Sequence, residues 1–204
     1  SVRIILTTAA FHGLEVLVAD IQNAFLTAPT KEKVWLEAGP EFGPEQGKTF
    51  IIVRALYGLK SAGASFRSFM AEKFDAMNFE SSRADPDVWL RPATTNDEFE
   101  HYEYIITYVD DILVVSTRAM DIMKEIQGEV KFKKDKIEPP DIYLGARLKL
   151  KEIDNIVCWT ISSSDYIKSA IETIEKAIEG RALTTNKKIL LRLLLFNILC
   201  LFAS

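Results

Sequence analysis

One stretch of the sequence constrains the fold most: YEYIITYVDDILVVS, Tyr102–Ser116, an apolar run interrupted at its centre by Asp110 and Asp111. Apolar strands are buried, and a buried charge without a partner is costly enough that proteins pair or neutralise it. The run is best interpreted as a β-hairpin with its tight turn at Val109–Ile112. At such a turn adjacent side chains can converge, whereas within a strand they point to opposite faces. The stretch therefore predicts a hairpin that carries two acids at its tip.

A third acid, Asp20, stands near the end of another predicted strand, LEVLVADIQ, Leu14–Gln22. If the two strands are neighbours, Asp20 completes a cluster of three carboxylates. Carboxylates are ligands that Mg²⁺ takes together with waters and phosphates. Two such ions about 3.5–4 Å apart stabilise the attacking and leaving oxygens of a phosphoryl displacement. The alternative is a solvated turn, because Asp tolerates turn conformations. The cluster alone leaves both interpretations open.

Composition is that of an ordinary globular protein and favours no special class. The chain has 204 residues, 48% hydrophobic and 26% charged, which suits one domain or a domain with an attached subdomain. The net charge of -4 gives no global basic field for nucleic acid, although a local basic patch remains compatible with it. Cys158 and Cys200 fit no metal or disulfide spacing. The most apolar segment, 189–203, is too short and interrupted for a membrane span.

The remaining pattern mixes helices and strands without a regular βαβ alternation, which favours an α+β fold with an antiparallel sheet. Apolar spacing predicts helices over residues 2–11, 61–77, 117–129 and 164–178. Further strands are predicted at 33–38 and 50–54, in the segment 84–92, and as a hairpin formed by 142–150 and 155–162.

Six segments in order resemble a known family. They are ADIQNAFL (19–26), RALYGLKSAGASF (54–66), ADPDVWLR (84–91), YVDD (108–111), DIYLGARLKL (141–150) and SSSDYIKSAIE (162–172). Jointly they are similar to the reverse transcriptases of copia-type LTR retrotransposons, over about residues 2–180. One departure is SAG at Ser61–Gly63, where the family has QAP, so a Pro that shapes the loop before the helix is absent.

The resemblance implies a polymerase palm-type antiparallel sheet with packed helices and a partial fingers subdomain over residues 1–182. An atypical apolar tail, 183–204, matches nothing in the family and reads like a truncated or frameshifted end. The implied function is an RNA- or DNA-templated DNA polymerase that adds dNTPs to a primer 3′-OH. Its context would be a larger Pol polyprotein with ribonuclease H and integrase, in a cytoplasmic virus-like particle, neither secreted nor in a membrane.

We expect the basic fingers segment and the ribonuclease H domain to lie outside this sequence. That expectation keeps two alternatives open. One is a catalytically inactive retrotransposon-derived fragment that keeps the palm fold. The other is a remnant that binds nucleic acid without chemistry.

The resemblance assigns the acids to catalysis and metal binding. Asp20 and Asp110 would bridge two Mg²⁺ (or Mn²⁺) ions, and Asp111 would support the site. Phe25 takes the place of the family's aromatic steric gate, which excludes a ribose hydroxyl; an ordinary core Phe is the alternative.

Other positions would contact nucleotide or nucleic acid. Tyr57 and Gly58 would line the incoming nucleotide, and Gly58 would allow a close backbone approach. Lys60 would meet a phosphate or the template backbone, unless it is a surface lysine. The segment Tyr143, Leu144 and Gly145 corresponds to the primer grip that holds the growing 3′ end; a plain core strand is the alternative.

A basic run, Lys133, Lys134 and Lys136, could contact backbone phosphates or donate a proton to pyrophosphate. We favour a solvated charge run for these three lysines.

Overall fold

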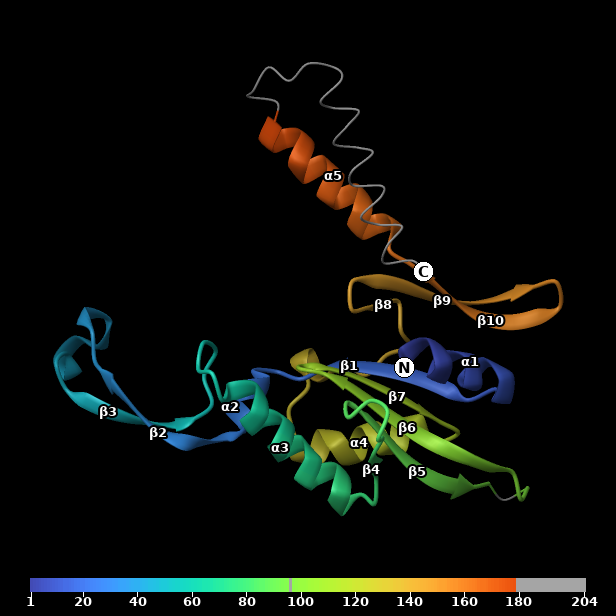
Figure 1. Ribbon diagram of the computed structural model, residues 1–204, viewed down its shortest axis with the longest axis horizontal. Coiled ribbons are helices and arrows are strands. Elements are labelled where there is room, and N and C mark those ends of the chain that lie inside the picture. The colour runs from blue at the N-terminus through green and yellow to red at the C-terminus, as the bar shows by residue number, and fades with distance from the viewer. Residues whose placement is uncertain (96, 179–204) are drawn as a thin grey trace.

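The computed structural model describes residues 1–95 and 97–178, and its centre is a five-stranded antiparallel sheet (Figure 1). The strand order is β1-β7-β6-β5-β4. The strands are β1 (Glu15–Asp20), β4 (Glu80–Ser81), β5 (Val88–Thr94), β6 (Glu100–Tyr108) and β7 (Asp111–Ser116). Every neighbouring pair is antiparallel. The predicted α+β class with an antiparallel sheet is confirmed.

Both faces of this sheet are covered, which explains why β7 lacks polar alternation. Ile112 and Val114 face one hydrophobic core, and Leu113 and Val115 face the other; all four are fully buried. Helices α3 (Ala62–Ala76) and α4 (Ala119–Glu129) contribute to the first core. Helix α1 (Val2–His12) and a second sheet contribute to the other. Side chains that alternate along a strand therefore all find apolar surroundings.

The second sheet has three strands in the order β10-β9-β8, and it confirms the predicted hairpin. Its strands are β8 (Ile142–Tyr143), β9 (Ala146–Ile153) and β10 (Ile156–Ser162). The β9–β10 turn places Asp154 and Asn155 at positive φ, as a tight two-residue hairpin requires. Helix α5 (Ser164–Ile178) follows and projects away from the sheet (Figure 1). The predicted tail, 183–204, lies outside the described residues.

A two-stranded hairpin extends from the other side of the molecule (Figure 1). It consists of β2 (Pro29–Glu37) and β3 (Thr49–Arg54), with a short 3₁₀ helix, Pro40–Glu45, between them. The short helix α2 (Ala24–Thr27) leads into it from β1. The strand predicted at 33–38 is longer than expected, because it begins at Pro29 and its register shifts before Val34.

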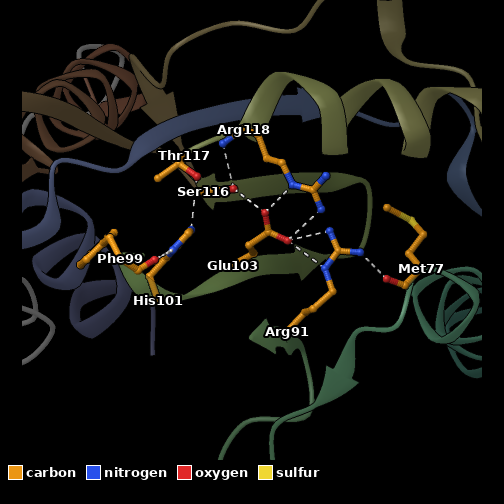
Figure 2. Close-up of polar contacts among 8 residues, drawn as sticks. All are labelled: Met77, Arg91, Phe99, His101, Glu103, Ser116, Thr117 and Arg118. Atoms are coloured by element: carbon orange, nitrogen blue, oxygen red, sulfur yellow. Dashed lines mark hydrogen bonds and ion pairs between the residues drawn. The ribbon is translucent and has the colours of Figure 1, made fainter. Parts of the chain in front are cut away.

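A buried ion-pair network joins three strands of the main sheet (Figure 2). Glu103 on β6 is fully buried and pairs with Arg91 of β5 at 2.6 Å and with Arg118 at 2.9 Å. Ser116 Oγ donates a third hydrogen bond at 2.8 Å. Burial alone would raise the pKa of Glu103, but hydrogen bonds from Arg118, Ser116 and Arg91 outweigh it and lower that pKa. The network therefore holds β5, β6 and β7 in register with a charged Glu103.

Among the described residues, no helix is both long enough and apolar enough to cross a membrane.

Candidate active site

The hairpin at Tyr102–Ser116 exists, with its turn one residue earlier than predicted. Tyr108 pairs with Asp111 across the turn, so Val109 and Asp110 form the loop and Asp111 begins β7. The predicted turn, Val109–Ile112, is therefore shifted by one residue. Val109 has a φ of 55°, a left-handed conformation that is strained for a β-branched residue. Such strain persists only where the surrounding structure enforces it, and it is common at functional sites.

Asp20 lies directly opposite Asp111. The two are cross-strand partners in the antiparallel β1–β7 pair. Like charges in this position repel one another and destabilise a sheet. The turn is fixed to β1 by the Ile21 amide, which donates to the Asp110 carbonyl at 2.6 Å. The structure thus brings Asp20, Asp110 and Asp111 to one end of the main sheet, and their roles there stay predictions.

The electrostatics of Asp111 reflect this crowding. Burial raises the pKa of Asp111, and the nearby charges of Asp110 and Asp20 raise it further. Lys133 opposes the shift. A cation placed among these carboxylates would relieve the repulsion.

The loop after α4 supplies a cation of the protein's own. Backbone hydrogen bonds join this loop to the free edge of β1, through Val18 with Glu138 and through Gln22 with Lys131. The attachment places Lys133 Nζ 3.0 Å from Asp20 Oδ2. The hydrogen bond with Asp20 raises the pKa of Lys133. A solvated charge run was the favoured prediction for the three lysines. The Lys133 side chain is 62% exposed, in agreement with that prediction, but its ammonium group also pairs with Asp20.

A cavity of about 260 Å³ opens between the acids, the lysine loop and β8. Asp20, Asp111, Lys133 and Lys134 line it together with Tyr143. Tyr143 is 5% exposed, and its hydroxyl has no hydrogen-bond partner among the described residues. Burial, followed by the charge of Asp111, raises the pKa of Tyr143. The cavity therefore has a buried polar group that a bound molecule could satisfy.

The other two primer-grip candidates form the β8–β9 turn. Leu144 and Gly145 both have positive φ, 50° and 75°, and Tyr143 pairs with Ala146 across them. This is the backbone that a two-residue hairpin turn needs. Leu144 is 44% exposed, so the turn presents an apolar tip to solvent.

The nucleotide-site candidates form a separate aromatic group. The ring of Phe25, on α2, lies 4.5 Å from that of Tyr57 and 6.0 Å from that of Phe66. Gly58 has a φ of 97°, which other residues rarely adopt, and a Cβ there would meet no atom within 4 Å. Conformation therefore requires this glycine. Lys60 is exposed and forms no ion pair within the described part of the chain.

The acid cluster has the donor chemistry that suits a divalent cation, because its ligands would be carboxylate oxygens. The neighbouring charges of Asp110 and Asp20 also make the electrostatic potential at Asp111 more negative. Within residues 1–95 and 97–178, however, no three His, Cys, Asp or Glu side chains form a ready-made metal site. Lys133 holds one of the Asp20 oxygens instead.

Comparison with known proteins decides the family. A family model for reverse transcriptase (RNA-dependent DNA polymerase) matches residues 1–186. The chain belongs to the reverse transcriptase family. It is 26% identical over 177 residues to the retrovirus-related Pol polyprotein from transposon TNT 1-94 of Nicotiana tabacum, covering 84% of this chain and 13% of that protein. It is also 26% identical over 116 residues to that from transposon RE1 of Arabidopsis thaliana, covering 56% of this chain and 8% of that protein.

These matches confirm the resemblance to copia-type retrotransposon reverse transcriptases. They also show that this reverse transcriptase chain spans only a small part of the polyproteins it resembles. Sequence reasoning missed two features of it, the ion pair of Lys133 with Asp20 and the network around Glu103. The one available signal for the network was an acid, Glu103, placed between two tyrosines at the start of the mainly apolar run Tyr102–Ser116.

Proposed function

We propose that this chain is the palm, with part of the fingers, of an RNA- and DNA-templated DNA polymerase that adds dNTPs to a primer 3′-OH. The observation that carries the proposal is the pairing of Asp20 opposite Asp111 with Asp110 on the adjoining turn, in a chain of the reverse transcriptase family. Two Mg²⁺ ions, or Mn²⁺, would stabilise the attacking and leaving oxygens. Asp20 and Asp110 would hold these ions, and Asp111 would keep the local potential negative.

The proposal assigns further steps of nucleotide addition to other residues of this chain. The Phe25 ring, supported by Tyr57, would lie under the sugar and exclude a 2′-hydroxyl. Gly58 and Lys60 would approach the triphosphate or the template backbone. The β8–β9 turn, with Tyr143 at its base, would hold the primer strand over the acids. Template, primer and dNTPs are the implied partners, in the context of a Pol polyprotein.

Primer extension tests this function. The chain, expressed with the coding sequence that adjoins it, is assayed with Mg²⁺ or Mn²⁺ on an RNA or DNA template. Asp110→Asn and Asp111→Asn should each abolish extension, whereas Asp154→Asn, on the remote β9–β10 turn, should not. Extension that survives both active-site changes would refute the assignment.

A second candidate function is nucleic-acid binding without chemistry. The ion pair between Lys133 and Asp20 favours it, because a lysine already occupies one predicted metal ligand. Binding that weakens steeply with added salt, in a chain with no extension under either metal, would support this candidate.

A further inference from the structure

A second cavity, of about 170 Å³, opens beside the Val109–Asp110 turn, which the proposed function makes the catalytic turn. Its walls include the aromatic rings of Phe25 and Phe66 and the turn residue Val109. Arg67 and Asp87 also line it, and Arg67 Nε lies 3.2 Å from Asp87 Oδ1. Both side chains of this pair are about half exposed. The cavity thus combines apolar walls with a cationic donor, Arg67, an anionic acceptor, Asp87, and the hydroxyl-bearing Thr107.

Gly63 leaves part of the cavity wall as bare backbone. It lies in the first turn of α3, where the copia-type motif has Pro, and a Cβ at this position would meet no atom within 4 Å. The departure from the family motif, at Ser61–Gly63, therefore coincides with open space beside the predicted nucleotide site. Because Gly63 itself lines the cavity, we expect a larger side chain at this position to reduce its volume.

The size and the lining of the cavity suit a flat ring with polar edges. An apolar cavity of about 150 Å³ is large enough to bind a benzene ring. A nucleobase is a flat ring that stacks on aromatic side chains and carries donors and acceptors on its edges. Arg67 can donate to such acceptors, and Asp87 can accept from such donors.

We propose that this cavity binds one unstacked nucleobase of a nucleic-acid strand held at the catalytic turn. The proposal rests on the proposed polymerase function and adds a base-binding position to it. A strand fits better than a free nucleotide, because the only cation in the cavity lining is Arg67, which is already paired with Asp87. Phe25 and Val109 connect the cavity to the acids, since Val109 directly precedes Asp110.

Photocrosslinking in EDTA tests the proposal without any catalytic step. The probe is a primer–template whose single-stranded template segment carries one 5-iododeoxyuridine, moved one position at a time. At one position the crosslink should map to the rings of Phe25, Phe66 or Trp89, which all line the cavity. Gly63→Leu, which fills the cavity, should remove that crosslink and weaken strand affinity about tenfold, as expected for losing one stacked base.

Two further variants make the result decisive. Arg67→Ala leaves the walls in place and should weaken affinity for the same probe several-fold. Lys73→Ala is the matched control, since Lys73 is on the same helix, pairs with Glu129, and does not line the cavity. The control should keep both the crosslink and the affinity.

Crosslinks that map only elsewhere, or that survive Gly63→Leu at unchanged affinity, would overturn the proposal. A chain that binds no strand at all would overturn it as well. Primer extension without a cavity crosslink would overturn this inference alone and leave the polymerase function standing.

Discussion

Lys133 and Asp20 form an ion pair of 3.0 Å between a loop and the end of β1, 113 residues apart in the sequence. The lysine acts as the internal counter-ion of the acid cluster, since it also lowers the raised pKa of Asp111. A divalent cation that binds Asp20 must therefore compete with Lys133 for the same carboxylate.

This competition predicts that Lys133→Ala binds Mn²⁺ more tightly than the unchanged chain. Removing the lysine frees one ligand oxygen and makes the local potential more negative. Electron paramagnetic resonance of free Mn²⁺ would show a several-fold lower dissociation constant. Lys134→Ala is the matched control, because Lys134 lines the same cavity but forms no ion pair among the described residues. An equal effect of both changes, or weaker binding in Lys133→Ala, would contradict direct competition.

The raised pKa of Asp111 predicts that Asp111→Asn stabilises the fold at neutral pH. A carboxyl whose folded pKa lies above its ordinary 3.8 destabilises the folded state once it ionises, so stability falls as the pH rises through this region. Removing the charge should raise the free energy of unfolding at pH 7 by no more than about 1 kcal/mol, since the site is screened. Urea denaturation should show the gain disappearing below pH 3.8. Asp154→Asn, on the remote β9–β10 turn, is the control for the substitution itself and should leave the free energy of unfolding at pH 7 unchanged.

The Glu103 network predicts a graded loss of stability. Glu103→Ala leaves Arg91, only 14% exposed, without its partner and should cost about 3–5 kcal/mol, as breaking buried ion pairs does. Arg118→Ala should cost about 1 kcal/mol, because Arg118 is half exposed. The lowered pKa of Glu103 means that its contribution is present above its ordinary 4.5 and is lost as the pH falls below that value. Equal losses for the two variants in urea denaturation would contradict this account.

The sequence alone predicted the α+β class and the acid-tipped hairpin, since both follow from local patterns of apolar and turn residues. The proximity of Asp20 and Asp111 was harder to predict, because it depends on which strands pair across some 90 residues of chain. The position of Lys133 beside Asp20 could not be predicted from the sequence. Backbone hydrogen bonds attach its loop to β1, and backbone groups leave no signature in side-chain patterns. The one-residue shift of the turn could not be predicted either, because turn preferences do not favour Val109 at a positive φ.

The Phe25 ring predicts sugar selectivity if the chain is a polymerase. Phe25→Val removes the ring that packs 4.5 Å from Tyr57 and should open space for a ribose 2′-hydroxyl. Single-nucleotide extension should show the preference for dNTPs over rNTPs reduced by roughly tenfold or more, as expected for a change in a steric pocket. Phe42→Val, on the exposed β2–β3 hairpin, is the control and should keep the preference. Unchanged selectivity in Phe25→Val would leave Phe25 as an ordinary packing residue.

The buried hydroxyl of Tyr143, which has no hydrogen-bond partner among the described residues, allows a test of whether Tyr143 binds a ligand or only packs in the core. Because no described residue bonds this buried hydroxyl, Tyr143→Phe should leave the free energy of unfolding unchanged or raise it by about 1 kcal/mol. If the hydroxyl bonds a primer strand in the cavity beside Asp111, the same change should weaken primer–template affinity several-fold, measured by fluorescence anisotropy in EDTA. Tyr166→Phe, at an exposed tyrosine on α5, should alter neither quantity. A Tyr143→Phe protein that loses stability and keeps its affinity would make Tyr143 a core residue and remove it from the primer grip.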